Sequence, residues 1–333
     1  MTGSAAMNHN DRPPVRTIEG APSWRSRALG AFVRLALREP LDSDADIAQL
    51  RRRYEALDAR YFQPERGVVR EAVDCNGVPA EWISVPQTRA GRVIFYLHGG
   101  SFAFRFPNAH AAFAARLCRR LGARALIPDY RLAPEHPFPA APDDCLAAYR
   151  WALDNGCDAR GMVFLGDSAG GNLALVTLSR TRRANEALPA CAVLLSPAVD
   201  CTFESRSLID NAELDPMLSL ADLLVLRGRY LPSPQLYVDP DASPLFADFA
   251  GFPPLFLQAG SSELLRDEAV RTAQRAHVAG VHVELELWPQ TPHNFQMVAF
   301  LPEAALAIDQ IVRFVVAHSG WQATAKASLA YQT

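Results

Sequence analysis

Residues 166–171 read Gly-Asp-Ser-Ala-Gly-Gly, and this short segment constrains the fold of the chain more than any other. The apolar run directly before it predicts a short buried strand, and the apolar run 172–178 predicts the first turns of a helix. Gly166, Ser168 and Gly170 form the Gly-x-Ser-x-Gly pattern of a nucleophile elbow, which exposes a serine on a sharp strand-to-helix turn. Bulky side chains at the two glycines would collide in such a turn. The segment therefore predicts an α/β fold in which Ser168 is the nucleophile.

A serine hydroxyl is a weak nucleophile, so Ser168 requires a histidine base and a carboxylate that orients the base. In chains with this elbow the acid and then the histidine follow the serine, on loops after strands at one edge of the sheet. The strand-like run 281–288 leads into a loop that holds His293, which is the predicted base. The other histidines precede the serine, or lie in a polar tail or near the ends of helices and strands: His9, His98, His110, His136, His277, His282 and His318.

Two carboxylates follow the strand-like run 254–258 and are candidates for the acid. Glu263 and Asp267 are four residues apart, and either could orient the imidazole of His293. Asp267 precedes a helix predicted for 268–279, where capping and the helix dipole are sufficient to explain a carboxylate. Glu263 has no such explanation, so it is the predicted acid.

A glycine-rich loop follows the strand predicted for 92–97 and reads His98-Gly99-Gly100-Ser101. It matches the His-Gly-Gly-Gly loop that contributes N–H donors to an oxyanion hole. Consecutive glycines let the backbone approach the substrate and turn its amides inward. Ser101 replaces the last glycine: it keeps the backbone N–H, while its side chain narrows the local space. His98 is predicted to be a structural residue that is hydrogen-bonded within the loop.

These motifs, together with the stretch 129–144 that begins Asp-Tyr-Arg-Leu-Ala-Pro-Glu-His-Pro, resemble the hormone-sensitive-lipase-like esterases called bacterial family IV. The resemblance runs from about Gly91 to the C-terminal helix. It implies an α/β-hydrolase fold in which Ser168 is the nucleophile and His293 the base. The oxyanion-hole residues that it implies are Gly99, Gly100, Ser101 and Ala169, with Gly99 shaping the loop and the other three supplying backbone N–H groups.

The chain departs from this family at the acid. The family usually has an aspartate followed by Pro-Leu-Arg-Asp-Glu, and alignment on Leu-Arg-Asp-Glu places Glu263 at that position. The runs that start at Ser196, Asp239 and Gly260 further resemble a branch that contains acetyl-hydrolases and terpenoid lactone hydrolases.

Strand-like and helical runs alternate from Val68 onward, which predicts a mostly parallel, eight-stranded sheet flanked by helices. Helical spacing of apolar residues near 24–38 and 45–61 predicts two helices before the sheet. The resemblance implies that they form part of a cap over the active site, with a second part inserted after the sixth strand. The predicted organisation is a mobile tail (1–20), N-terminal cap helices (21–66), a catalytic domain (67–201 and 238–333) and a cap insertion (202–237).

Composition narrows the class of partner. A formal net charge of −3 argues against a nucleic-acid binder, and no stretch approaches the ~18 apolar residues of a spanning helix, so stable membrane insertion is not expected. The N-terminus lacks the pattern of a signal peptide. The six cysteines lack CxxC spacing, so neither a zinc site nor a redox motif is indicated. We expect a cytoplasmic enzyme without a metal or an organic cofactor. The sequence leaves open whether the enzyme forms a homodimer.

The predicted function is that of a serine carboxylesterase, which hydrolyses short- to medium-chain esters of small molecules through an acyl-enzyme. A lactonase or an N-deacetylase would use the same triad and pass through the same kind of intermediate. A non-catalytic small-molecule-binding protein is the alternative from another class, because plant gibberellin receptors share this fold. Those receptors lack the triad histidine, which this chain retains as His293.

Overall fold

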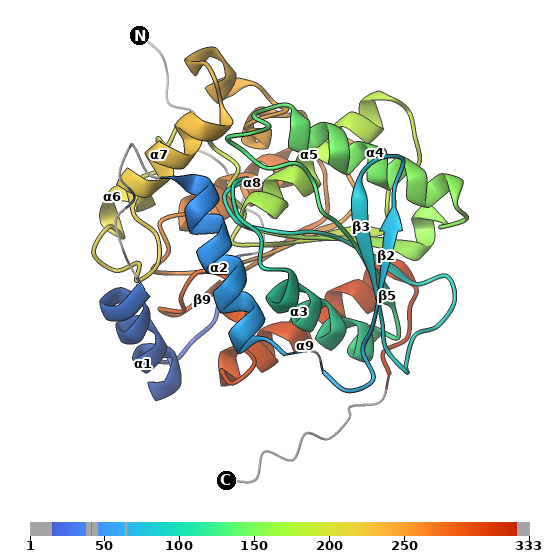
Figure 1. Cartoon of the computed structure of the whole chain (residues 1–333), viewed down its shortest axis with the longest axis horizontal. Coiled ribbons are helices and arrows are strands. Elements are labelled where there is room, and N and C mark those ends of the chain that lie inside the picture. Colours follow the sequence, from blue (N-terminus) through green and yellow to red (C-terminus); the bar gives the residue numbers. More distant parts are fainter. Residues whose placement is uncertain (1–14, 38–40, 42–45, 64, 325–333) are drawn as a thin grey trace.

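The computed structural model describes residues 15–37, 41, 46–63 and 65–324. A twisted nine-stranded sheet lies at the centre, in the order β1-β9-β8-β7-β6-β4-β5-β3-β2 (Figure 1). β3 is antiparallel to both β2 and β5, and the other neighbours run parallel. The strands are β1 Val15–Thr17, β2 Val69–Asp74, β3 Pro79–Ser84, β4 Val93–Leu97, β5 Arg124–Pro128, β6 Met162–Asp167, β7 Cys191–Leu195, β8 Leu255–Gly260 and β9 Val283–Trp288.

The eight predicted strands are confirmed, but the expected strand number was wrong because β1 adds a ninth. β1 lies within the segment expected to be a mobile tail, and it pairs in parallel with β9, with Val15 opposite Leu285. All three of its side chains are exposed at the sheet edge, so no alternation of apolar and polar residues marks it as a strand. Residues 1–14 of the expected tail lie outside the described residues.

Helices cover both faces of the sheet. α3 and α9 pack on one face, and α4, α5 and α8 pack on the other (Figure 1). The helices are α1 Trp24–Phe32, α2 Ile47–Tyr61, α3 Pro107–Leu121, α4 Ala140–Asp154, α5 Ala169–Arg183, α6 Ser207–Asp210, α7 Leu220–Tyr230, α8 Arg266–Val278 and α9 Pro302–Ser319. Among the described helices, none is both long enough and apolar enough to cross a membrane.

Strand β6 shows why the elbow is preceded by an uninterrupted apolar run. Its side chains alternate between the two hydrophobic cores: Phe164 packs with α4 and α5, while Val163 and Leu165 pack with α3 and α9. A central parallel strand buries both faces, so residues 162–165 are all apolar, and the buried Asp167 at its end is hydrogen-bonded. Ser168 directly follows the carboxyl end of this strand, so it lies where the parallel strands of the sheet end.

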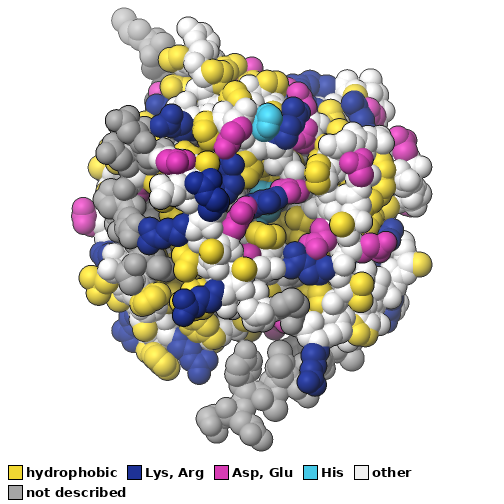
Figure 2. Space-filling view, in the orientation of Figure 1, with side chains coloured by type: hydrophobic (Ala, Val, Ile, Leu, Met, Phe, Trp, Pro, Cys, Tyr) yellow, Lys and Arg dark blue, Asp and Glu magenta, His cyan; other side chains and the backbone are white. Residues whose placement is uncertain are grey.

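The N-terminal helices and the insertion after β7 meet on one side of the molecule, at the left of Figure 1. Ile47 of α2 and Leu226 of α7 are buried in one cluster with Phe104, which follows the glycine-rich loop. The two segments therefore lie together over the carboxyl edge of the sheet. On the face drawn in Figure 2, basic and acidic side chains are interspersed.

Candidate active site

The turn between β6 and α5 holds Ser168 in a strained conformation, with φ 52° and ψ −119°. A left-handed φ at a residue with a side chain costs of the order of 1–3 kcal/mol, and such strain clusters at functional sites. The neighbouring glycines are required by space. A Cβ at Gly166 would lie 2.2 Å from the carbonyl oxygen of Gly170, and one at Gly170 would lie 1.9 Å from that of Leu97. The local structure is therefore the sharp elbow that the motif predicts.

His293 and Glu263 are brought together from the loops after β9 and β8. His293 Nδ1 lies 2.7 Å from Glu263 Oε2, and both side chains are buried. The other carboxylate oxygen of Glu263 accepts hydrogen bonds from Ser196 Oγ, at 2.8 Å, and from the backbone N–H of Gly260. These bonds hold the carboxylate in one orientation. Because an ionised carboxylate only accepts hydrogen bonds, the ring of His293 must carry its proton on Nδ1 to donate to it.

The electrostatics of the site favour a charged imidazole. Burial alone disfavours the imidazolium, but the hydrogen bond and the negative charge of Glu263 outweigh it and raise the pKa of His293 above its ordinary 6.5. The carboxylates of Asp215 and Asp167 act in the same direction. The site therefore favours the protonated imidazole of His293 more than bulk water does.

Asp267, the other candidate acid, makes its hydrogen bonds to groups other than His293. It lies in the first turn of α8, but the expectation that it caps its own helix is wrong, because its Oδ2 accepts from the backbone N–H of Ser207 at 2.9 Å. That N–H belongs to the first residue of α6. Its Oδ1 accepts from Arg266 Nε at 2.8 Å. Asp267 thus attaches the insertion to α8.

Asp167, directly before Ser168, joins three segments of the site and was not singled out from the sequence. Its Oδ1 accepts from Tyr96 Oη at 2.8 Å and from the Gly99 N–H at 2.9 Å. Its Oδ2 accepts from Asn294 Nδ2 at 2.8 Å. Burial raises the pKa of this carboxyl, although these hydrogen bonds oppose the rise. The elbow, the glycine-rich loop and the histidine loop are therefore held against one another by one buried side chain.

The glycine-rich loop turns sharply after β4. A Cβ at Gly99 would lie 2.2 Å from Asp167 Oδ2, and Gly100 has a φ of 123°. Ser101 and Phe102 also have positive φ values, 53° and 59°. A left-handed backbone at Ser101 explains why a glycine suits the last position of this motif.

His98 is a structural residue of this loop, as predicted. Its Nδ1 lies 2.8 Å from the carbonyl oxygen of Gly99, and its ring stacks on Tyr130 with 4.2 Å between the ring centroids. Burial lowers its pKa to about 4, so the ring is neutral at physiological pH. The neutral ring stabilises the conformation of the loop and adds no charge to it.

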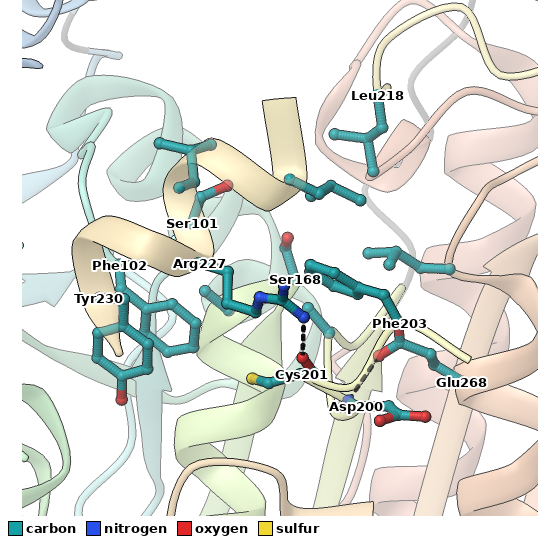
Figure 3. Close-up of a pocket in the computed structure, with 15 residues that line it drawn as sticks. Ser101, Phe102, Ser168, Asp200, Cys201, Phe203, Leu218, Arg227, Tyr230 and Glu268 are labelled. Carbon is teal, nitrogen blue, oxygen red and sulfur yellow. Dashed lines mark hydrogen bonds between the residues drawn. The ribbon is translucent and has the colours of Figure 1, made fainter. Parts of the chain in front are cut away.

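A cavity of ≈ 50 Å³ adjoins Ser168 (Figure 3). Its walls come from the glycine-rich loop, the elbow, the loop after β7, α7 of the insertion and the start of α8. Most of the lining is apolar, but Arg227 and Glu268 also face it. Sequence reasoning missed both. Arg227 belongs to none of the motifs, Glu268 served only as the last residue of the Leu-Arg-Asp-Glu run, and the fold alone brings the two together.

The insertion is bound to the loop that carries the acid. Ser207 Oγ donates to the carbonyl oxygen of Leu264 at 2.6 Å, and Asn211 Nδ2 donates to that of Glu263 at 2.7 Å. Asp215 Oδ2 accepts from the backbone N–H of Leu264 at 2.9 Å. All three side chains are buried, so the position of the insertion and that of Glu263 depend on each other.

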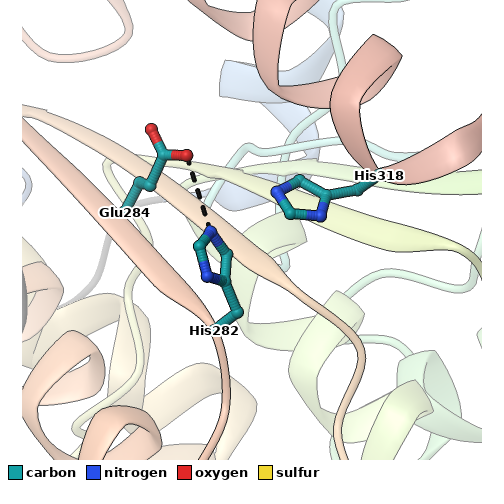
Figure 4. A group of neighbouring side chains, drawn as sticks. All are labelled: His282, Glu284 and His318. Carbon is teal, nitrogen blue, oxygen red and sulfur yellow. Dashed lines mark ion pairs between the residues drawn. The ribbon is translucent and has the colours of Figure 1, made fainter.

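Among the described residues, one group has ligand atoms close enough for a metal ion: His282, Glu284 and His318 (Figure 4). His282 Nε2 lies 3.6 Å from Glu284 Oε1, and the other carboxylate oxygen accepts from Arg313 at 2.6 Å. The group lies at the amino end of β9, whereas His293 follows the carboxyl end. It is therefore separate from the site around Ser168.

Comparison with known proteins agrees with this geometry. Residues 94–297 match the family model of the alpha/beta hydrolase fold. An acetyl-hydrolase of Streptomyces hygroscopicus is 39% identical over 251 residues, which cover 75% of this chain and 83% of the relative. An esterase of Acinetobacter venetianus is 34% identical over 292 residues, with coverage of 87% and 96%.

Solved structures are equally similar. An esterase from the bacterial hormone-sensitive lipase family superposes with a TM-score of 0.82 at 38% identity and covers 90% of this chain and 100% of its own. An esterase/lipase from an uncultured bacterium gives a TM-score of 0.84 at 34% identity, with coverage of 90% and 99%. The chain therefore belongs to the α/β-hydrolase family. Within that family it is a carboxylic ester hydrolase of the hormone-sensitive-lipase-like group, as the sequence resemblance predicted.

Glu268 generates a prediction about stability. Its side chain is fully buried, Oε2 accepts from the backbone N–H groups of Val199 and Asp200, and burial raises its pKa from 4.5 to about 8. An acid with a raised folded-state pKa stabilises the fold at low pH, and this contribution is lost as the pH rises from about 4.5 to about 8.

Glu268→Gln mimics the protonated acid and removes this pH dependence. We expect the free energy of unfolding of the variant, relative to wild type, to rise between pH 5 and pH 9 by at least about 1.4 kcal/mol, the equivalent of one pKa unit. Urea unfolding at both pH values measures it. A difference between the two proteins that is constant with pH would contradict the buried, protonated acid.

Proposed function

We propose that this protein is a serine carboxylesterase that hydrolyses short- to medium-chain esters through an acyl-enzyme. The observation that carries the proposal is the 2.7 Å hydrogen bond between His293 and Glu263, on loops beside the elbow of Ser168. A buried carboxylate, a histidine of raised pKa and a strained serine are the groups that nucleophilic acyl transfer requires.

Each residue has one role in the proposed mechanism. Ser168 Oγ attacks the ester carbonyl carbon while His293 takes the hydroxyl proton, and Glu263 stabilises the imidazolium that forms. The carbon–oxygen bond to the alcohol then breaks, and the alcohol leaves with the proton from His293. Water, activated by the same histidine, attacks the acyl-enzyme and releases the acid and free Ser168. No step requires a metal or an organic cofactor.

The oxyanion is proposed to be bound by backbone N–H groups of Gly100, Ser101 and Ala169. Ala169 is the first residue of α5, and the first N–H groups of a helix have no acceptor within the helix. The N–H of Gly99 already donates to Asp167, which supports a role in shaping the loop. A well-placed donor is worth about 3–4 kcal/mol of transition-state stabilisation.

Segments 21–66 and 202–237 are proposed to form a cap that selects the substrate. α7 of the second segment supplies one wall of the cavity beside Ser168. At ≈ 50 Å³ the cavity has room for about three to five groups of the size of a water molecule. The proposed substrates are accordingly at the short end of the range, and the acetyl-hydrolase activity named for the Streptomyces relative is consistent with this.

A cytoplasmic location is part of the proposal. The six cysteines are all free and buried, as expected for a protein that folds in a reducing compartment: Cys75, Cys118, Cys145, Cys157, Cys191 and Cys201.

Replacement of the nucleophile tests the proposal. Ser168→Ala should reduce hydrolysis of p-nitrophenyl acetate at least about a thousandfold, because the variant keeps only the oxyanion donors and binding. Circular dichroism should show an unchanged fold. Substantial hydrolysis by a folded Ser168→Ala protein would contradict the triad.

The two candidate acids, Glu263 and Asp267, provide a matched pair of variants. Glu263→Gln removes the charge that favours the imidazolium, so we expect turnover to fall at least about a hundredfold, near 2.7 kcal/mol. Because Glu263 raises the pKa of His293, the acid limb of the kcat/KM profile should also move to lower pH. Asp267→Asn, which can still accept from Ser207, should change turnover by less than about threefold, under ~0.7 kcal/mol. Loss of activity in Asp267→Asn with normal activity in Glu263→Gln would reverse the assignment.

A further inference from the structure

Polar side chains that the proposed mechanism does not use line the cavity beside Ser168. Three side chains that line it each have a buried polar atom without a hydrogen-bond partner: Arg227 Nε, Tyr230 Oη and Glu268 Oε1. An unpaired buried polar group costs about 1–3 kcal/mol. Arg227 is the one of the three with a positively charged side chain, and it lines the same cavity as Ser168.

Arg227 is the only cation that lines this cavity, and it has no carboxylate partner among the described residues. Its Nη1 donates to the carbonyl oxygen of Cys201 at 2.8 Å (Figure 3). Its guanidinium lies 3.9 Å from the ring centroid of Tyr237 and 5.1 Å from that of Phe203. These contacts orient the guanidinium but leave its charge without a counter-ion.

The two carboxylates in the cavity wall do not neutralise Arg227. Asp200 is paired with Arg271 and also accepts from Thr202. Glu268 uses one oxygen for two backbone N–H groups, and burial raises its pKa to about 8, so at neutral pH it mostly carries a proton. Burial also raises the pKa of Tyr230, which keeps its hydroxyl proton. The charge of Arg227 is therefore not balanced by the carboxylates of the cavity wall, and an anion complements it.

We propose that this cavity binds a carboxylate carried by the ester substrate, and that Arg227 is the residue that recognises it. The inference rests on the proposed esterase function and names its substrate class: half-esters of short dicarboxylic acids, or acyl esters of short hydroxy acids. The reaction is unchanged. Ser168 attacks the ester carbonyl and the alcohol leaves with the proton from His293. Water then hydrolyses the acyl-enzyme to the acid and free Ser168, and the bound carboxylate takes no part.

Two pairs of substrates of matched shape test the charge and show which side of the ester carries it. For the acyl side, monoethyl glutarate is compared with ethyl 5-methylhexanoate by ethanol release. For the alcohol side, acetoxyacetate is compared with isobutyl acetate by acetate release. In each pair an isopropyl group replaces the carboxylate. The measured quantity is the ratio of kcat/KM for the anionic ester to that for the neutral ester.

We expect this ratio to exceed ten in one pair for the wild-type enzyme, and to fall at least tenfold in Arg227→Met. Arg229→Met is the matched control, because it removes an arginine from the same helix that does not line the cavity, and it should leave the ratio unchanged. Arg227→Lys should retain part of the preference. If Arg227→Met does not fold, Arg227→Gln, which is uncharged and keeps a donor, takes its place.

The outcomes distinguish failure of the carboxylate site from failure of the esterase function. Ratios below one in both pairs, or a preference that Arg227→Met leaves intact, would overturn the carboxylate site while the esterase function stands. Failure of the wild-type enzyme to hydrolyse any of the four esters or p-nitrophenyl acetate would instead overturn the proposed function itself.

Discussion

The buried carboxylate of Asp167 is the constraint on which the rest of the site depends. It accepts hydrogen bonds from β4, from the glycine-rich loop and from the histidine loop, although these segments are far apart in the sequence. A hydrogen bond to a charged group contributes about 1.5–3 kcal/mol, and a partner that is left unpaired in the interior costs a similar amount. The relative positions of the proposed oxyanion donors, Ser168 and His293 are therefore coupled through a side chain that need not touch the substrate.

The acid loop is the second point at which distant segments meet. Glu263 is held by Ser196 and the Gly260 N–H on one side, while Ser207, Asn211 and Asp215 bind the insertion to the same loop. The segment that lines the cavity beside Ser168 is thus attached to the residue that is hydrogen-bonded to His293. Substitutions in the insertion that break these bonds should therefore also displace Glu263.

Features encoded by local patterns were predictable from the sequence. The eight strands, the elbow at Ser168, the structural role of His98 and the choice of Glu263 over Asp267 as the partner of His293 all depend on motifs a few residues long. Three features were not predictable. β1 is exposed and its residues show no apolar periodicity, and Asp267 caps α6 rather than its own helix. Arg227 and Glu268 are far apart in the sequence and line one cavity only in the folded chain.

The central claim is that Ser168 is the nucleophile of this site, and covalent trapping tests it most directly. The protein is treated with diethyl p-nitrophenyl phosphate, which phosphorylates activated serines, and analysed by intact mass and peptide mapping. The account predicts one diethylphosphoryl group per chain, on the peptide that contains Ser168, with loss of esterase activity in the same proportion. A label on another residue, or full activity in protein labelled at Ser168, would contradict it.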